Sequence, residues 1–558
     1  MKGKLPHFEI GIVMAGAVSA GAYTSGVIDF FFEALDQWYE QKAKQQEQYG
    51  DDFSKWEIPP HDVLIKAMSG ASAGAIVAAI TASSLHSDII PVVGNPLKSI
   101  TNKLYESWVQ RIDISELLKT QDLENPKAPV LSFLDPTILD ELGRDVLNIK
   151  STGKKRPYID DPFEVYLCVT NLRGVPYVIK SQGANSNFKG HYMVKHADYM
   201  HFAIGEHSGE VEGAIALTPD KSDISNWEIL INSALASSAF PVGLPPRKLE
   251  RTSIDEYEKR LWEIPTRDPM ETRICSEYRS ISPDKDLVAQ DSYEFVTVDG
   301  GIISNEPIEL VRLALRGNKQ RNPRGGQQAN RATLLIDPFP NDVDAVNPKS
   351  NLLDLVLRIF RSFINQNRFK ADELILALDE DVYSRFLIAP ERSDDQGKKP
   401  LACGSLNAFG GFLSQDFRHH DYILGRRNCQ RFLQKYFVLP VSNPLFNAWS
   451  EGLKANPQLQ VQKVGQPETF LPIIPLLGSA KKEINLPNWP KYQKENLKFL
   501  EKQIQERVRV VVPRLINQSI NDAFSRTALN TLWFFKRGSL AKKIRDIIQD
   551  NLEKYGQL

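Results

Sequence analysis

The sequence contains few cysteines and no long apolar segment. Its cysteines, Cys168, Cys275, Cys403 and Cys429, lie far apart and form no Cys-x-x-Cys pair. This spacing argues against a disulfide framework and against a thiolate zinc site. No apolar run approaches the roughly 20 residues that a membrane-spanning helix requires. We therefore expect a protein of a reducing, cytoplasmic compartment that contacts a membrane only at its periphery.

The chain also lacks an excess of charge of either sign. Its 558 residues contain 68 Lys and Arg against 69 Asp and Glu, so the whole molecule offers no reason to expect a nucleic-acid partner. Residues 481–558 are locally basic, with 16 Lys and Arg against 8 Asp and Glu. The composition, 42% hydrophobic and 25% charged, excludes fibrous and intrinsically disordered classes.

Two classes of ligand site lack their sequence signatures. The histidines between residues 191 and 207 form no His-Glu-x-x-His pattern, so we expect no metal site and no cofactor there. Gly16 and Gly21 follow a predicted strand, as glycines do in phosphate-binding loops. However, neither Gly-Lys-Ser/Thr nor Gly-x-Gly-x-x-Gly is present. A nucleotide-binding protein is therefore disfavoured.

The first 90 residues alternate between strand and helix patterns. Phe8–Met14 and Val63–Met68 are apolar runs typical of buried parallel strands. Gly21–Leu35 carries apolar residues at helical spacing, and Ser72–Leu85 is small and apolar enough to be a helix that packs closely on a sheet. This alternation predicts an α/β fold.

The pattern continues to about residue 390. Further strands are expected at Phe163–Thr170, Tyr177–Lys180, Tyr293–Val298 and Ala332–Ile336, and helices at Trp227–Ala239, Pro307–Leu315 and Leu352–Leu378. The highly charged segment of about residues 253–292 predicts an inserted surface excursion. Residues 391–558 form a second region, mixed and then largely helical, with helices expected at Trp489–Val511 and Ala541–Tyr555.

A Gly-x-Ser-x-Gly motif lies between the second predicted strand and its helix. In this context Gly70-Ala71-Ser72-Ala73-Gly74 predicts a sharp turn that exposes the Ser72 hydroxyl at a helix N-terminus. Gly70 and Gly74 are needed because a Cβ at either position would meet the neighbouring strand or helix. The alternative is a close-packing turn in which Ser72 only caps the helix.

A nucleophilic serine needs a base, and two candidates follow in the chain. Asp299 ends a predicted strand and precedes Gly300 and Gly301, which allow a close approach of the backbone. His419 and His420 would instead complete a Ser-Asp-His triad in the chain order of α/β-hydrolases. Because they lie in the charged stretch 418–427, a polar surface or a structural ion-pair cluster is an alternative for them.

Four motifs in order resemble those of patatin-like acyl hydrolases. They are the loop and helix Gly16–Val27, the elbow Gly70–Gly74, the segment Ala234–Pro246 with its Ala-Ser-Ser-Ala sequence, and Asp299–Gly301. The resemblance implies a three-layer α/β/α sheet domain over residues 1–390. It further implies that Ser72 is the nucleophile and Asp299 the base of a dyad, without a metal or cofactor. The implied substrate is a phospholipid, a lysophospholipid or another lipid ester.

The resemblance also implies an oxyanion hole at Gly16, Ala17 and Val18, where the sequence departs from the family. Ala17 and Val18 replace the usual glycines, and Ala20 replaces the usual arginine. Backbone N–H groups can survive such changes, but a β-branched valine is poorly suited to positive φ. A catalytically degenerate scaffold is therefore an alternative to an active phospholipase A or lysophospholipase.

Two basic segments are candidates for contact with lipid. Residues 532–545 combine Leu532-Trp533-Phe534-Phe535 with several lysines and arginines, a composition suited to an anionic membrane surface. The alternative is a helix whose aromatic side chains are core. Residues 425–429, Gly-Arg-Arg-Asn-Cys, could bind phosphate, but a solvated run of charge is the more frequent outcome.

Overall fold

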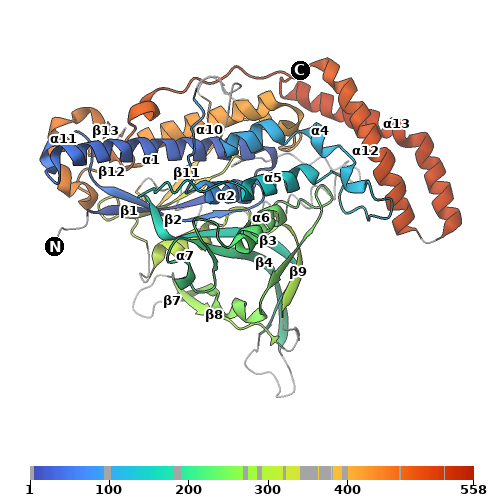
Figure 1. Ribbon diagram of the computed structural model, residues 1–558, viewed down its shortest axis with the longest axis horizontal. Helices are drawn as coiled ribbons and strands as arrows, with labels where there is room; N and C mark the ends of the chain where they lie inside the picture. The colour runs from blue at the N-terminus through green and yellow to red at the C-terminus, as the bar shows by residue number, and fades with distance from the viewer. Residues whose placement is uncertain are drawn as a thin grey trace.

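The computed structural model describes most of the chain (Figure 1). The described residues are 5–93, 102–179, 190–267, 274–285, 292–317, 322–339, 362, 379, 381–392, 400–463, 467–520 and 522–558. The expected helix Leu352–Leu378 lies outside them, apart from residue 362.

A mostly parallel sheet forms the centre of the molecule. Its strand order is β11-β10-β1-β2-β3-β4-β5, and β9 joins β3 to β6 beside this path. The pairs β1–β2, β1–β10, β2–β3, β10–β11 and β4–β5 are parallel, whereas β3–β4, β3–β9 and β6–β9 are antiparallel. The strands span His7–Met14 (β1), Asp62–Gly70 (β2), Ile159–Ile179 (β3), His191–Ile204 (β4), Ile215–Leu217 (β5), Arg247–Arg251 (β6), Tyr293–Asp299 (β9), Arg331–Ile336 (β10) and Arg385–Ile388 (β11). The α/β class is confirmed.

Helices cover both faces of the sheet, which explains the apolar character of its central strands. Along β1, the side chains of Ile10, Ile12 and Met14 enter the large core under one helical layer, and Val13 packs in a separate cluster with Val311 of α7. The first layer contains α1 (Gly21–Tyr49), α2 (Ala73–Ser84), α5 (Thr137–Leu147), α6 (Ile224–Ser237) and α10 (Gln415–Lys435), and α7 (Ile308–Arg316) lies on the opposite face. The expected three-layer arrangement is present.

Two expectations about element length differ from the structure. The first helix does not end at Leu35 but continues to Tyr49, because its polar second half lies on the surface and contains good helix formers. The expected strands Phe163–Thr170 and Tyr177–Lys180 are parts of one long strand, β3. The register with β4 shifts between Thr170 and Val175, where Gly174 has φ 75°, and this bulge hid the continuity of the strand.

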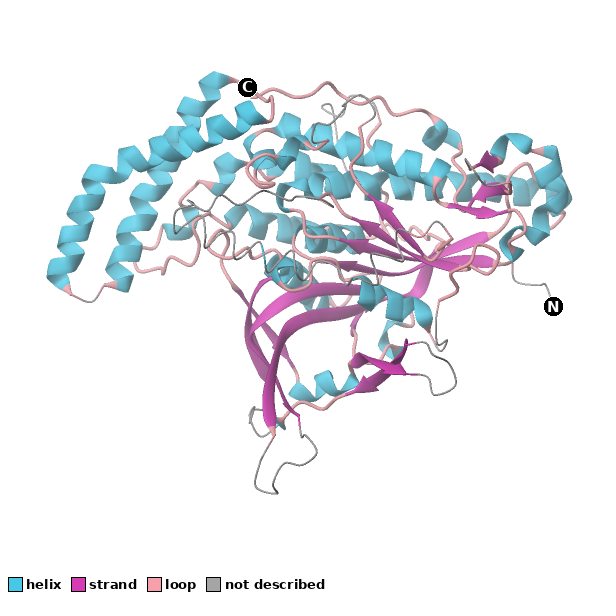
Figure 2. Cartoon of the chain, turned by 180° about the vertical axis from the view of Figure 1, so that it is seen from behind, coloured by secondary structure: helices cyan, strands magenta, loops and turns pink. Residues whose placement is uncertain are grey.

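Beyond the sheet's layers, β3, β4, β6 and β9 curve away as an antiparallel extension (Figure 2). The predicted insertion 253–292 adds to this extension a short helix, Ile254–Lys259, and the hairpin β7 (Leu261–Arg267) and β8 (Ile274–Ser280).

The C-terminal region has mixed and then helical structure, as expected. A small sheet joins β12 (Val438–Pro440), β14 (Thr469–Pro472) and β13 (Val461–Gln462). The last two helices, α12 (Lys494–Ser519) and α13 (Ala523–Lys554), form a hairpin that projects from one end of the molecule (Figures 1 and 2). Among the described helices, none combines the length and the apolar character that crossing a membrane demands. The remaining short helices are α3 (Lys103–Tyr105), α4 (Ile114–Leu117) and α11 (Ser450–Ala455).

The helices α1 and α10 cross in unusually close contact. A Cβ at Gly26 would lie 1.9 Å from the carbonyl oxygen of Tyr422, and a Cβ at Gly425 would lie 2.1 Å from that of Tyr23. Because the obstructing atoms are backbone, neither position can accept a side chain unless the helices separate. This contact attaches the C-terminal region to the sheet domain.

We expect Gly425→Ala to lower the free energy of unfolding by about 2–3 kcal/mol, the usual cost of overpacking a closed contact. Chemical denaturation of the full chain measures this change. The matched control is Gly538→Ala on α13, where a Cβ would meet nothing within 4 Å. This control should gain up to about 1 kcal/mol from helix propensity. Equal effects of the two substitutions would contradict the proposed close crossing.

Candidate active site

Strand register brings Ser72 and Asp299 together across 227 residues of sequence. Gly70, the last residue of β2, pairs with Leu167 of β3. Two residues further along β3, Val169 pairs with Asp299, the last residue of β9. Because β3 extends past the end of β2 and β9 runs back along this extension, both loops begin at the same edge of the sheet.

Ser72 lies in a strained turn between β2 and α2. Its φ and ψ are 52° and −125°, a conformation that L-residues rarely adopt, and it is the N-cap of α2. A Cβ at Gly70 would lie 2.5 Å from the Gly74 carbonyl oxygen, and one at Gly74 would lie 2.3 Å from that of Met14. The glycines of the motif therefore meet the steric need expected from the sequence.

The Ser72 hydroxyl donates a hydrogen bond to Asp299. Ser72 Oγ lies 2.6 Å from Asp299 Oδ2, and the Gly301 N–H donates to Oδ1 at 2.7 Å. Burial raises the pKa of Asp299 to about 6, although these two hydrogen bonds oppose the shift. The carboxylate is thus a stronger base than an exposed aspartate and is still mostly ionised at neutral pH. Gly300 begins the short helix Gly300–Ile302 that supplies the Gly301 donor.

The loop from Gly16 to Val18 lies against the serine. A Cβ at Gly16 would be 3.1 Å from Ser72 Cβ, and the Gly16 N–H donates to the Asn305 carbonyl oxygen at 3.2 Å. In the described part of the chain, no acceptor is recorded for the N–H groups of Ala17 and Val18. Val18 adopts φ 48°, the conformation that its β-branched side chain disfavours.

Two polar residues at the site had no role in the sequence prediction. The Ser72 N–H donates to Ser237 Oγ at 2.9 Å. Ser237 belongs to the Ala-Ser-Ser-Ala segment, so the motif was visible but the contact was not. The Asn305 side chain donates to Glu306 at 2.7 Å, and its backbone carbonyl holds Gly16. No sequence signal distinguished Asn305.

An apolar cavity opens beside Ser72 and Asp299. Its walls come from distant parts of the chain. Trp108 lies in a π-helical turn, Glu106–Arg111, and Ile112 directly follows this turn. Phe409 and Phe412 come from the C-terminal region. The other lining residues are Val18, Ala73, Ile76, Leu117, Leu134, Leu139, Ser238, Phe240, Gly243 and Leu244. Among the described residues that line it, Asp299 is the only one with an ionisable side chain.

The histidines of the alternative triad are engaged elsewhere. His420 is buried in α10 and lies within hydrogen-bond distance of Asp421 (2.7 Å) and Arg392. His419 Nδ1 lies 2.8 Å from the hydroxyl of Tyr105. Neither lines the cavity at Ser72. For residues 418–427 the sequence left two alternatives to a triad, a polar surface and a structural ion-pair cluster. These buried contacts agree with the ion-pair cluster and not with the polar surface.

The arginines of the basic segment 425–429 also form ion pairs within the protein. Arg426 is buried and pairs with Asp29 and with Glu33, the latter at 2.5 Å, and Arg427 pairs with Glu483. The expectation of a solvated run of charge is wrong at Arg426, because two carboxylates of α1 face its guanidinium. In the described residues, no group of three or more His, Cys, Asp or Glu side chains could hold a metal ion.

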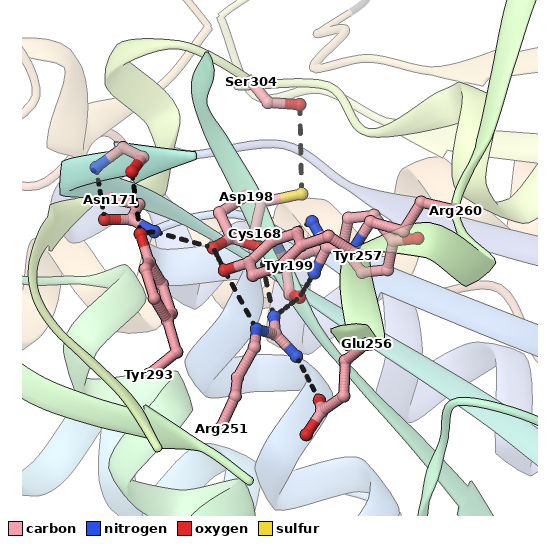
Figure 3. A network of polar contacts seen from close by, with 11 residues as sticks. Cys168, Asn171, Asp198, Tyr199, Arg251, Glu256, Tyr257, Arg260, Tyr293 and Ser304 are labelled. Carbon is pink, nitrogen blue, oxygen red and sulfur yellow. Dashed lines mark hydrogen bonds and ion pairs between the residues drawn. The ribbon is translucent and has the colours of Figure 1, made fainter. Parts of the chain in front are cut away.

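A buried polar network fixes the strands that carry Asp299 (Figure 3). At its centre Asp198 of β4 pairs with Arg251 at 3.1 Å and Arg260 at 2.7 Å, and accepts hydrogen bonds from Tyr257 (2.6 Å) and Asn171 (3.1 Å). Burial raises the pKa of Asp198, but the charges of Arg260 and Arg251 outweigh it and hold the pKa well below its ordinary value. The aspartate is therefore ionised at neutral pH.

This network connects to the partners of β9 on both sides. Asn171 of β3 pairs with Thr297, and Arg251 of β6 pairs with Tyr293. Next to them, the Thr170 hydroxyl donates to the Asp299 carbonyl oxygen at 2.8 Å. The network thus holds β3, β4 and β6 in the register that positions Asp299.

The chain is similar to known proteins. The family model described as Patatin-like phospholipase matches residues 12–312, so the chain belongs to the patatin-like phospholipase family. The uncharacterized protein y4iI of Sinorhizobium fredii (strain NBRC 101917 / NGR234) is 33% identical over 598 residues, covering 97% of this chain and 81% of that protein. Among solved structures, VipD from Legionella pneumophila aligns with 99% of this chain and 88% of its own at 11% identity, with a TM-score of 0.24.

The raised pKa of Asp299 predicts a pH-dependent effect of Asp299→Asn on stability. The folded-state pKa of about 6 exceeds the ordinary 3.8, so folding is penalised by the buried charge at pH values above 6 and not below 4. Asparagine removes this penalty. The variant should gain about 3 kcal/mol over the wild type at pH 8 and much less at pH 4.5.

Denaturant unfolding at the two pH values measures this difference. Glu228→Gln replaces an exposed carboxylate of α6 and should change stability by less than about 0.5 kcal/mol at either pH. A gain for Asp299→Asn that is the same at pH 4.5 and pH 8 would mean that Asp299 carries no such penalty.

Proposed function

We propose that the protein is a serine-dependent acyl hydrolase that cleaves carboxylic ester bonds of phospholipids or lysophospholipids. The observation that carries the proposal is the hydrogen bond from Ser72 Oγ to Asp299 Oδ2, at 2.6 Å, beside an apolar cavity. The burial that raises the pKa of Asp299 supports its role as the base. Family membership supports a lipid ester as the substrate.

The reaction divides into two steps at Ser72. Ser72 Oγ attacks the ester carbonyl while Asp299 Oδ2 takes its proton, and the tetrahedral intermediate collapses as the departing alcohol receives that proton. A water molecule then attacks the acyl-enzyme and gives its proton to Asp299. The fatty acid leaves, and the proton returns to Ser72. Each step places negative charge on the former carbonyl oxygen.

We assign the stabilisation of that charge to backbone N–H groups. The N–H groups of Ala17 and Val18 are our candidates, because neither has a hydrogen-bond acceptor within the described residues. The Gly16 N–H is occupied by Asn305, so this proposal moves the oxyanion hole away from Gly16. Ala73 begins α2 and adds a helix N-terminus next to the nucleophile. The positive φ of Val18 is then the conformation that such a loop needs, and it argues against a degenerate site.

Replacing either member of the dyad should abolish hydrolysis. We expect Ser72→Ala and Asp299→Asn to lower kcat/KM by at least about 1,000-fold on both a short-chain p-nitrophenyl ester and mixed phospholipid vesicles. In the wild type, kcat/KM should rise with pH through about 6, because Asp299 must be ionised to accept the proton.

The double variant His419→Ala/His420→Ala separates the dyad from a triad. A dyad enzyme should keep most of its activity in this variant, provided that circular dichroism shows an intact fold. Full activity in Ser72→Ala would exclude the serine nucleophile. A wild type without Ser72-dependent activity on either substrate would favour a scaffold.

We further propose that the helical hairpin α12–α13 contacts the membrane surface at its tip. Large apolar side chains are exposed there: Phe524 is 84% exposed and Leu532 55%, and Leu515 and Leu529 are also exposed. Lys536, Lys542 and Lys543 are exposed on the same helix. This combination suits an anionic lipid surface.

The structure divides the predicted segment 532–545 between surface and core. Trp533 packs against the hydrophobic core, Ala541 is buried, and Arg545 pairs with Asp546 at 2.6 Å. The alternative of a core helix therefore holds for these residues. Our proposal moves the contact toward the tip, at Phe524 and Leu532.

The hairpin is linked to the cavity wall by direct contacts. Arg507 of α12 is buried and donates to the Phe133 carbonyl oxygen at 2.9 Å and to Asp122. The next residue, Leu134, lines the cavity, and the Phe133 N–H donates to the Val242 carbonyl oxygen at 2.7 Å. Val242 is 78% exposed and precedes Gly243, which lines the cavity, so exposed apolar surface lies next to the cavity wall. Contact at the tip would bring the cavity close to lipid.

Removing the apolar side chains at the tip should weaken vesicle binding. We expect Phe524→Ser/Leu532→Ser to lower partitioning onto phosphatidylserine-containing vesicles by about tenfold or more, because each buried side chain contributes about 1.5–3 kcal/mol. Binding should also weaken at high salt. Cosedimentation measures both effects.

Ile547→Ser is the control for this prediction, because Ile547 is 58% exposed but lies near the other end of α13. It should bind vesicles like the wild type. Equal binding by the tip variant and the wild type would exclude the tip as the contact.

A further inference from the structure

A second apolar cavity lies behind the one that opens at Ser72. It is smaller than the first and is lined by α2, α5 and α6 together with Ser107 of the π-helical turn and Ile112. Its lining is aliphatic apart from the hydroxyl of Ser107. This lining accepts neither a headgroup nor a charged ligand, because a buried charge without a partner is strongly unfavourable.

The two cavities share three walls. Ile76, Ile112 and Leu139 line both of them. These three aliphatic side chains form a wall common to both spaces, so the two spaces adjoin. Because Ile76 is one turn along α2 from Ser72 and Ile80 is two turns along it, the second cavity extends about 6–12 Å along the helix axis from the nucleophile.

Small residues leave room at the far end. Ala79 of α2 and Ala234 of α6 are both buried and line only the second cavity. The helices α5 and α6 close it, since a Cβ at Gly143 would lie 2.9 Å from Ile231 Cγ2. The side chains at this end therefore limit how far the space extends between α2 and α6.

We propose that the two cavities together are the acyl-chain site, and that Ala79 and Ala234 set the longest chain accepted. A short acyl group fills only the cavity at Ser72. A long unbranched chain displaces Ile76, Ile112 and Leu139 and extends between α2 and α6, while the headgroup stays outside. The site therefore selects long, straight acyl esters. This inference rests on the proposed function, because it assumes that the acyl group is attached to Ser72 during the reaction.

Filling the far end should shorten the preferred chain. We expect Ala234→Leu to lower the ratio of kcat/KM for p-nitrophenyl palmitate to that for p-nitrophenyl butyrate by at least tenfold. Ala79→Leu, on the facing helix, should do the same, so the test does not depend on one variant folding. Glu228→Leu is the matched control, because it places the same side chain on the exposed surface of α6. Its ratio should equal that of the wild type.

A binding assay separates this inference from the proposed function. The assay compares Ser72→Ala with Ser72→Ala/Ala234→Leu by displacement of a fluorescent fatty-acid probe. Palmitate should displace the probe at least tenfold less well from the double variant than from Ser72→Ala. Butyrate should displace it equally well from both. An unchanged palmitate-to-butyrate ratio in folded Ala234→Leu and Ala79→Leu would overturn the chain-length inference while Ser72-dependent hydrolysis stands. If Ser72-dependent hydrolysis is absent but binding still depends on chain length, the proposed hydrolase function is wrong and the acyl-chain site still stands.

Discussion

The burial of the Asp299 carboxylate is the constraint on which the rest of the site depends. Its two oxygens receive hydrogen bonds from Ser72 and Gly301, so the group is held in one orientation and shielded from water. Burial raises its pKa to about 6, which makes the carboxylate more basic than an exposed aspartate and also imposes a cost on folding. The register of β3 with β9 and the network around Asp198 hold the carboxylate in place against that cost.

Much of the fold could be predicted from the sequence because its signals are local. Apolar runs indicated the central strands, the Gly70–Gly74 turn indicated Ser72 as a candidate nucleophile, and motif order indicated Asp299 as its candidate base. The continuity of β3 could not be predicted, because the bulge at Gly174 resembles a turn between two strands. The helical extent of α1 was missed because its polar half lacks an apolar pattern.

The cavity was the least predictable part of the site. Its walls include Phe409 and Phe412, which follow Asp299 by more than a hundred residues and carry no motif. Ser237 was recognised only as part of a segment, since a serine motif does not indicate which backbone group the hydroxyl will meet. Such contacts depend on tertiary packing, which no local pattern records.

Phe409 and Phe412 show that the C-terminal region supplies part of the candidate site. The stretch around them contains three successive residues at positive φ, Leu406, Asn407 and Ala408, and the Ala408 carbonyl oxygen accepts the Ser19 N–H at 3.2 Å, directly after Val18. The loop that we assign to the oxyanion hole is thus completed by the C-terminal half of the chain. A fragment that ended before Phe409 would therefore contain Ser72 and Asp299 but lack part of the cavity wall beside them.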